Sequence, residues 1–410
     1  MATRYFEPLR HRDFTLLWSG QTVSMLGDGV FTVTLALETL RVDPHPIGLS
    51  YVLAARVLPA VAFVLLGGVI ADRVPRRLAM LGSDLARGAA VAAIAVLVAT
   101  GAVHLAALIV LAFVFGVADA FFFPASTAIT PELVPPGLLV GASALSGTST
   151  QLAQILVGPA VGGVIVGLLG TAWGFGIDAA SFAVSAACLA AMSARPKPEP
   201  GQTSPLRDIG EGLRYCRSQR WLWVSILGAG LGNLVAFSPL AALIPLLVQH
   251  SLHGGGIALG LVLAAGGLGG LAASLLLGHR GAPRRRIVHL WLGWGLSGVG
   301  VVGLGFVPGV WLAGGVAFLI YSLDTYGNVL WNPLLQAGVP AAMIGRVASV
   351  DYFFSFALSP LGLLAAGAAA EAIGVRATLV AGGAITALTT LIPLLPGVHD
   401  PEPSNDVCAW

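Results

Sequence analysis

Three aspartates lie inside long apolar runs of the sequence, where a charged side chain is costly. Asp28 stands between two glycines in the first run, and Asp119 and Asp324 lie in the fourth and tenth runs. An acid near the centre of a lipid bilayer usually lines a cavity, pairs with a base or carries a proton. We interpret these three residues as candidates for proton coupling. The alternative for Asp28 is an acid that only makes hydrogen bonds within the helix packing.

The tenth run is unusually polar for a membrane segment. It combines aromatic and amide side chains, which can stack on a large organic ligand and hydrogen-bond to it. Arg56, in the second run, is either the partner of Asp28 or a residue near the outer surface. Asp178 and Asp351 are interpreted as structural. The candidates for lining a substrate cavity are Arg56, Tyr321, Tyr326, Asn328, Trp331, Asn332 and Gln336.

The segment 67–80, GGVIADRVPRRLAM, places one acid and three arginines between two apolar runs. Arginines on one side of a membrane fix the orientation of the chain. Acids contribute little to orientation, so Asp72 needs another role, and we expect it at the positive N-terminus of a neighbouring helix. That helix is the eleventh, which begins near Arg346. Contacts made only while the cytoplasmic side is closed would latch that state.

We expect other charged residues to join this latch. Arg73 or Arg76 is expected to contact Glu132, which follows the fourth run. Asp84 and Arg87 are three residues apart, so they share one face of a helix and form a structural pair. The whole expected gating network is Gly68, Asp72, Arg73, Arg76, Arg77, Asp84, Arg87, Glu132 and Arg346.

The fifth run contains the sequence GPAVGG, with Gly158, Pro159, Gly162 and Gly163. Two glycines four residues apart leave a smooth strip on which another helix can approach closely. Pro159 removes a backbone hydrogen bond and can kink the helix. The motif is either a packing device or a seal between the two halves of the chain on the outer side.

The composition indicates the solvent that surrounds these segments. Only 10% of the 410 residues are charged, against about 25% in soluble domains, and the mean hydropathy is +0.88. We count about twelve apolar runs, each near the ~20 residues that cross a bilayer as a helix. They cover roughly 14–40, 47–71, 78–100, 104–129, 139–169, 172–193, 221–248, 256–278, 287–307, 310–335, 342–371 and 374–396.

The basic residues orient these runs. Arg56 and Arg87 lie within runs; of those that lie between the runs or near their ends, all but two fall on the side of the N-terminus, which predicts that both termini are cytoplasmic. Only Arg41 and Arg376 lie on the opposite side. The single lysine, Lys197, leaves no P-loop, which excludes transport driven by ATP hydrolysis within this chain. The three cysteines and eight histidines show no metal-binding spacing, so we expect no metal and no cofactor.

Short motifs recur about 200–210 residues apart, which is typical of parallel repeats. Arg76-Arg77 returns as Arg284-Arg285, and Gly158-Pro159 returns as Ser359-Pro360. We therefore predict an all-α membrane protein with twelve transmembrane helices in two pseudo-symmetric six-helix bundles. The expected parts are a bundle at 1–193, a cytoplasmic linker with an amphipathic segment at 194–220, a bundle at 221–396 and a cytoplasmic tail at 397–410.

Several of these motifs resemble a known family. The pattern Gly68-x-x-x-Asp72-Arg73-x-x-Arg76-Arg77 resembles the loop 2–3 signature of the major facilitator superfamily, with Pro75 in place of the usual glycine. The GPAVGG run resembles part of the superfamily's antiporter motif. The branch containing the enterobactin exporter and macrolide efflux pumps is similar at 84–87, 121–135, 178–186, 211–218 and 345–349.

The resemblance implies a proton-coupled exporter of amphipathic small molecules such as drugs, macrolides or siderophores. It implies an inner-membrane protein that is a monomer, meets protons and lipid, and binds no nucleic acid. Two alternatives stay open on the sequence alone. One is a facilitator or importer on the same scaffold, and the other is a membrane receptor or enzyme, against which no nucleophile–base spacing or metal triad is visible.

Overall fold

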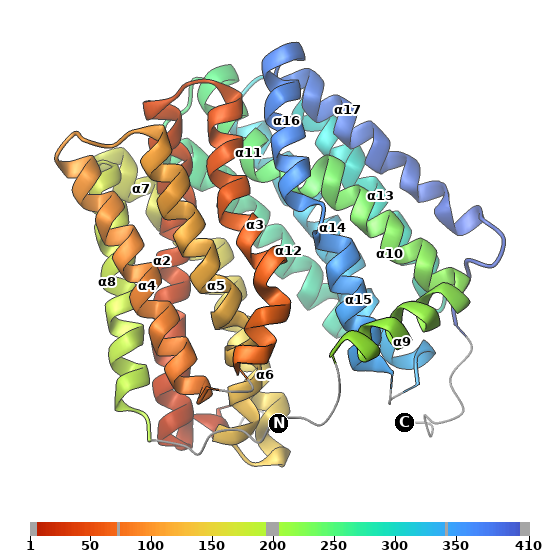
Figure 1. Cartoon of the computed structure of the whole chain (residues 1–410). Coiled ribbons are helices and arrows are strands. Elements are labelled where there is room, and N and C mark those ends of the chain that lie inside the picture. The colour runs from red at the N-terminus through yellow and green to blue at the C-terminus, as the bar shows by residue number, and fades with distance from the viewer. Residues whose placement is uncertain (1–5, 72–73, 194–204, 341–342, 402–410) are drawn as a thin grey trace. The chain divides into compact units, whose positions relative to one another are not determined.

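The computed structural model describes residues 6–71, 74–193, 205–340 and 343–401, with the backbone alone for 64–71 and 205–209. Helices make up nearly all of this, and no strand occurs in these ranges. Asp72 and Arg73 lie outside the described residues, as do the surroundings of Gly68. The all-α membrane fold that the sequence predicts is confirmed (Figure 1).

The contacts within the chain define two compact units, which are described separately below. Unit 1 comprises residues 1–201 and 248–264, and unit 2 comprises residues 202–247 and 265–410. The first turns of one helix, α12, therefore belong to unit 1 and the remainder to unit 2. The bundle boundaries at 193 and 221 stay a prediction.

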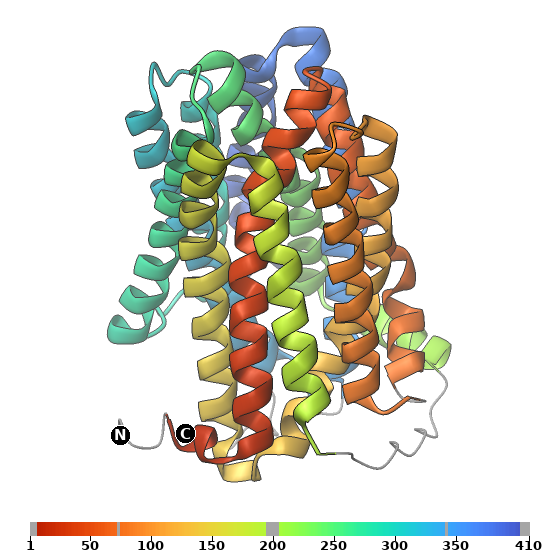
Figure 2. The ribbon, with the colours of Figure 1, turned by 90° about the vertical axis from the view of Figure 1, so that its left-hand side faces the viewer.

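Unit 1 is built on α2, which packs against both α7 and α8, as Figure 2 shows. The other strong pairings are α3 with α5, and α4 with α5 and α8. Its elements in chain order are η1 (Glu7–Arg10), α2 (Arg12–Val42), α3 (Pro46–Ala71), α4 (Arg76–Ala99), α5 (Leu105–Leu133), η2 (Pro136–Leu138), α6 (Leu139–Ser149), the π-helical η3 (Thr150–Val157), α7 (Gly158–Leu169) and α8 (Thr171–Ala191).

Unit 2 packs α13 against α14 and α17, α11 against α16, and α9 against α15. Its elements are α9 (Pro205–Ser218), α10 (Arg220–Gly232), the π-helical η4 (Asn233–Phe237), α11 (Ser238–Leu246), α13 (Arg286–Leu304), α14 (Val310–Gly338), α15 (Ile344–Phe356), α16 (Ser359–Ile373), α17 (Val375–Leu388) and η6 (Thr389–Leu394). The remaining elements, at the boundary of the two units, are the π-helical η5 (Leu247–Ser251) and α12 (Gly256–Arg280).

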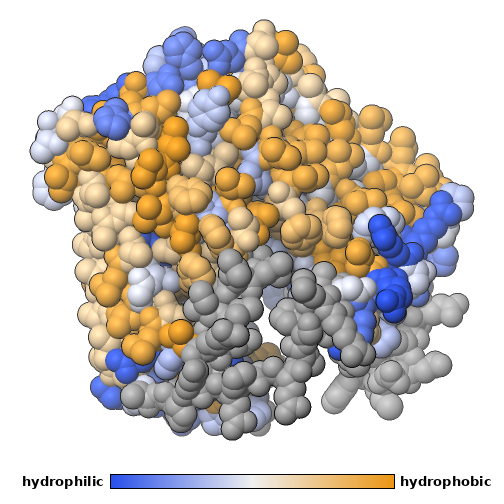
Figure 3. Space-filling model, in the orientation of Figure 1, coloured by the Kyte–Doolittle hydropathy of each residue, from blue (hydrophilic) through white to orange (hydrophobic). Residues whose placement is uncertain are grey.

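Eleven helices among the described residues are long and apolar enough to cross a membrane. The predicted run absent from this set is α14, which at 29 residues is long enough to span. Its polar side chains, including Asp324 and Asn328, account for its lower hydropathy. Large apolar side chains such as Leu168 and Trp311 are more than 70% exposed, and Figure 3 shows apolar residues over much of one face. Lipid is the solvent that suits such a surface.

Two glycines make equivalent tight turns in the two halves of the chain. Gly170 joins α7 to α8 and Gly374 joins α16 to α17, each with φ of +89°. Only glycine adopts this conformation without a steric penalty. Each turn directly connects two membrane helices, so it fixes how the last two helices of each half meet.

Aromatic side chains form the core of unit 1. The Phe31 and Phe115 rings stack at 5.1 Å, while Phe175 and Phe182 meet them edge-on at 5.9 and 5.8 Å. Such pairs add about 0.5–1.5 kcal/mol each beyond the burial of their area. These rings surround the charged residues of the same unit.

Candidate functional site

Arg87 is the centre of a buried charged cluster in unit 1. Its guanidinium lies 2.5 Å from Oδ1 of Asp84, one turn earlier on α4, and 2.9 Å from Oδ1 of Asp119 on α5. Arg87 is 3% exposed and Asp84 is fully buried. The pairing of Asp84 with Arg87 that the sequence predicts is therefore present. The second partner, Asp119, was expected to have a separate role.

Three phenylalanine rings surround the same guanidinium. The Arg87 Cζ lies 4.0 Å from the ring centroid of Phe122, 4.7 Å from that of Phe182 and 5.9 Å from that of Phe115. The ring faces attract a cation, and more strongly when water is excluded. Arg87 is thus held in place by two carboxylates and by an apolar wall.

Asp28 on α2 lies beside this cluster and is 7% exposed. Its Oδ1 atom is buried and has no hydrogen-bond partner among the described residues. The charges of Arg87, Asp119 and Arg56 all act on it, and it interacts in turn with Asp178 on α8. We refer to Asp28, Arg56, Asp84, Arg87, Asp119 and Asp178 as the charged cluster.

The sequence left two alternatives for Arg56, a pair with Asp28 or a place near the outer surface, and the structure shows a third arrangement. Its guanidinium lies over the rings of Phe31 and Phe115, at 5.1 and 4.8 Å from their centroids. It therefore lies in the aromatic core of unit 1, and within the described part of the chain it forms no ion pair with Asp28. The arginine acts on Asp28 through space.

The predicted gating network is present in part. Arg76 donates to Oε1 of Glu132 at 2.5 Å and to the carbonyl oxygen of Ala128 at 2.7 Å, which confirms the expected contact with Glu132. Arg77 donates to the last carbonyl groups of α8, those of Leu189 and Ala190, where a positive charge is favourable.

Arg346 at the start of α15 belongs to unit 2. It pairs with Glu211 of the amphipathic helix α9 at 2.8 Å. The expected approach of Asp72 to this helix falls outside the described residues. The latch as a whole therefore stays a prediction.

The GPAVGG motif lies where α7 crosses two other helices. A methyl group added at Gly158 would come 2.7 Å from the Cα atom of Gly29 on α2, and one at Gly163 would come 2.5 Å from the carbonyl oxygen of Gly256 on α12. Pro159 stands in the first turn of α7, directly after the π-helical η3. Close helix packing is what the structure assigns to this motif.

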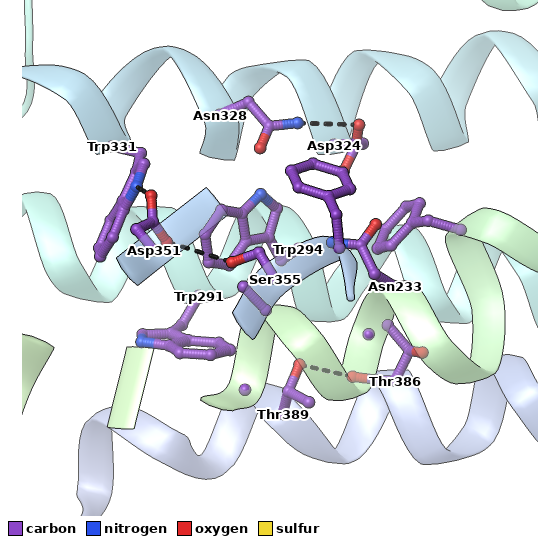
Figure 4. Close-up of a pocket in the computed structure, with 15 residues that line it drawn as sticks. Asn233, Trp291, Trp294, Asp324, Asn328, Trp331, Asp351, Ser355, Thr386 and Thr389 are labelled. Atoms are coloured by element: carbon purple, nitrogen blue, oxygen red, sulfur yellow. Dashed lines mark hydrogen bonds between the residues drawn. The ribbon is translucent and has the colours of Figure 1, made fainter. Parts of the chain in front are cut away.

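Unit 2 contains a pocket of about 230 Å³, drawn in Figure 4. Of the residues expected in a substrate cavity, Asn328 and Trp331 line it, together with the expected proton site Asp324. Tyr321, Tyr326, Asn332 and Gln336 do not. The lining consists of Gly228, Ala229, Gly232, Asn233, Phe237, Trp291, Trp294, Asp324, Asn328, Trp331, Asp351, Ser355, Phe356, Thr386 and Thr389.

Neutral groups hold the two acids of this pocket. Asn328 donates to Asp324 at 3.0 Å, as Figure 4 shows. Asp351 accepts a bond from the Trp331 indole N–H at 2.7 Å and another from the Ser355 hydroxyl at 3.1 Å. Asp351 was interpreted from the sequence as structural, and its place in the pocket was missed. The one feature of the sequence that could have pointed to Asp351 as a pocket residue is that it is an acid within an apolar run.

Three tryptophans form one continuous wall of the pocket. The Trp291 and Trp294 rings meet edge-on at 5.4 Å, and Trp294 lies 6.2 Å from Trp331. Trp291 and Trp294 come from α13, whose residues the sequence analysis did not select. Nothing in their spacing distinguishes them from ordinary core residues.

Long apolar helices, a buried charged cluster and a pocket lined by two acids and three tryptophans are typical of a multi-pass membrane transporter. The chain belongs to the transmembrane secretion effector family, whose model matches residues 3–406. The match covers almost the whole chain. The resemblance to the major facilitator superfamily is confirmed.

The curated relatives include several efflux proteins. Macrolide efflux protein A of Streptococcus pyogenes is 24% identical over 93% of this chain and 95% of its own length. The multidrug efflux pump Tap of Mycobacterium tuberculosis is 28% identical over 93% of both chains. The enterobactin exporter EntS of Citrobacter koseri is 27% identical over 82% of this chain and 80% of its own.

Solved transporter structures share the fold. A bacterial homologue of the human lysosomal transporter Spinster, in an inward-facing and unoccupied conformation, matches with a TM-score of 0.70 at 14% identity and covers 96% of both chains. The nucleoside transporter NupG matches with a TM-score of 0.70 at 12% identity, over 93% of this chain and 98% of its own.

Proposed function

We propose that this chain is a secondary active exporter of amphipathic small molecules that exchanges substrate for protons by alternating access. The observation that carries the proposal is Asp28, a buried carboxylate with one unpaired oxygen beside the Arg87 centre. The relatives, which include a macrolide efflux protein, an enterobactin exporter and a multidrug efflux pump, support the outward direction of transport.

The proposed exchange works by neutralisation of a buried charge. A proton on Asp28 removes a negative charge that is costly inside the membrane, so protonation favours whichever access state buries Asp28 more completely. One proton moving down a gradient of one pH unit releases about 1.4 kcal/mol. One-for-one exchange therefore sustains about a tenfold substrate gradient.

The rest of the proposal concerns placement and partners. The chain lies in the inner membrane as a monomer with both termini in the cytoplasm, in contact with lipid, and has no enzymatic activity. The movement of the bundles at 1–193 and 221–396 alternates the access of the substrate between the two sides of the membrane. The positive residues on one side of the predicted spans support this orientation, as does the amphipathic helix α9, which suits the inner membrane face.

Proteoliposomes test this proposal directly. The purified chain is reconstituted with a trapped pH indicator, and erythromycin is added as a macrolide probe under an imposed pH gradient. We expect substrate movement coupled to proton movement, and loss of that coupling in Asp28→Asn. Asp43→Asn is the matched control, because Asp43 lies in the connection after α2 and accepts bonds from its neighbour His45.

The result that would contradict the proposal is full pH-driven transport in Asp28→Asn. Macrolide uptake at a rate independent of the pH gradient would instead indicate a facilitator. Both outcomes are read from the same vesicles, since the dye reports protons and the labelled macrolide reports substrate.

A further inference from the structure

We propose that the pocket of unit 2 binds the cationic end of an amphipathic amine, such as a protonated tertiary amine or a quaternary ammonium group on an apolar body. The inference rests on the proposed function, since it names the substrate class of the exporter. It gives Asp324 a role in substrate binding in addition to its earlier place as a proton candidate.

The ionisable side chains that line the pocket are both acids. Asp324 and Asp351 both line it, and none of its lining residues is lysine, arginine or histidine. Within the described part of the chain, the bonds to these carboxylates come from Asn328, Trp331 and Ser355, all neutral. The charged cluster of unit 1 differs, because Arg87 there neutralises two acids. A ligand cation would supply the positive charge that the lining of this pocket lacks.

The aromatic wall suits the same ligand. Trp291, Trp294 and Trp331 stand next to one another around the pocket (Figure 4). Tryptophan faces bind cations best among the aromatic side chains, and quaternary ammonium groups are commonly recognised by several rings together. The bond from Trp331 to Asp351 holds one ring and one carboxylate in a fixed arrangement. The site is thus organised before a ligand arrives.

The size of the pocket limits what enters it. Its volume of about 230 Å³ is below the roughly 300–1,000 Å³ of pockets that enclose a drug-sized ligand. It fits one charged group with a single ring, while the apolar body of a larger ligand lies outside it. Two carboxylates also repel an anionic ligand, so the pocket selects against acidic molecules.

Binding to two small probes of opposite charge tests the inference. Benzyltrimethylammonium and phenylmethanesulfonate share a benzyl body and differ in the sign of their charge. Each is titrated into the purified full-length protein in lipid nanodiscs, and quenching of tryptophan fluorescence is recorded. We expect saturable binding of the cation and none of the anion. Equal binding of the two probes, or a preference for the anion, would overturn the inference.

Variants locate the binding. Asp324→Asn and Asp351→Asn are each expected to weaken binding of the cation at least about tenfold, since each removes a charge-assisted contact. Glu371→Gln is the control, because Glu371 is an exposed acid of the same unit. Asn233→Asp adds an acid to the lining of the pocket while the bond from Asn328 to Asp324 stays in place, so it should strengthen binding. This gain keeps the test informative if either loss variant folds poorly.

The two proposals fail separately. If Asp324→Asn and Asp351→Asn bind the cation as the unmodified protein does, the pocket of unit 2 is not the cation site, whatever the transport assay shows. Coupled transport that survives Asp28→Asn refutes the exchange mechanism, while binding of the cation in the pocket still stands.

Discussion

Replacing Arg87 by methionine should destabilise unit 1 more than any comparable change at a half-exposed arginine. Methionine keeps much of the length and packing of the side chain against the phenylalanine rings, but it removes the charge. Asp84 and Asp119, at 2.5 and 2.9 Å from the guanidinium, then lose the one cationic partner that each has among the described residues. Asp84 is fully buried, so water cannot replace the arginine there.

The magnitude follows from this burial. Removing one partner of a buried ion pair costs about 3–5 kcal/mol, and the lost cation–π contacts with Phe122 and Phe182 add about 0.5–2 kcal/mol each where water is excluded. Carboxylates that find other partners in the unfolded state within the membrane reduce this total. We expect a loss of about 4 kcal/mol in the free energy of unfolding, a large part of the roughly 5–15 kcal/mol that folded proteins possess.

The assay is reversible unfolding in mixed micelles, followed by tryptophan fluorescence. Arg346→Met is the matched control, because its pair with Glu211 is about 30% exposed on both sides and should contribute less than about 1 kcal/mol. Adding Asp84→Asn to Arg87→Met should recover more stability than adding Asp119→Asn, since the Asp119 side chain is 40% exposed. Equal losses at Arg87 and Arg346, or no recovery from Asp84→Asn, would refute the reasoning.

Three further predictions concern other parts of the chain. Asp400→Ala should lower the stability of unit 2 by about 1–2 kcal/mol in the same unfolding assay, because this carboxylate accepts the first backbone N–H groups of α13 at 2.9 and 2.7 Å. Gly163→Leu should lower thermal stability by about 1–3 kcal/mol through overpacking, whereas Gly82→Leu, with nothing within 4 Å of its added Cβ atom, should not. Cys216, whose pKa burial raises to about 11, should react with a maleimide roughly a hundredfold more slowly at pH 7.5 than an exposed thiol, measured in a variant with the other cysteines replaced by serine.

The pH dependence at Cys216 has a definite sign. Burial favours the neutral thiol and raises the pKa of Cys216 in the folded state. The stability gained from this burial is present below the ordinary pKa of a thiol and is lost as the pH rises toward about 11. Labelling should therefore accelerate about tenfold per pH unit from pH 7 to pH 10, and a rate that levels off near pH 9, as for an ordinary thiol, would contradict the assignment.

The sequence predicts the membrane helices because their signal is local. A run of about 20 apolar residues can bury its backbone polar groups only as a helix, whatever its neighbours are. The pairing of Asp84 with Arg87 is equally local, since residues three apart share a helix face. The unusual polarity of α14 is also visible in the sequence. It explains why this helix, although long enough, is not among the helices that are apolar enough to count as membrane spans.

What the sequence could not predict depends on how helices pack. Asp119 is 32 residues from Arg87, and its place on that guanidinium follows from the packing of α5 against α4. The pocket tryptophans of α13 read as ordinary core residues until α13 meets α14. Asp400 was placed in a tail, yet it caps α13. In each case the missing information is a tertiary contact, which spacing along the chain does not encode.

The two proposals give the two units different roles, which the distribution of charge supports. The charged cluster of unit 1 holds Asp28, Asp84, Asp119 and Asp178 against Arg56 and Arg87, that is, four acids and two bases. Arg87 satisfies two of the acids directly, so the exchangeable charge falls on the other two, Asp28 and Asp178, each of which has one buried oxygen without a hydrogen-bond partner among the described residues. The pocket of unit 2 has two acids and no base in its lining. A proton is small enough for the first site, and the second has room and aromatic surface for an organic cation. If each site is costly while its acids are charged and unpaired, occupation of either lowers the free energy of the state that buries it. Exchange further requires that the proton and the substrate do not occupy that state together.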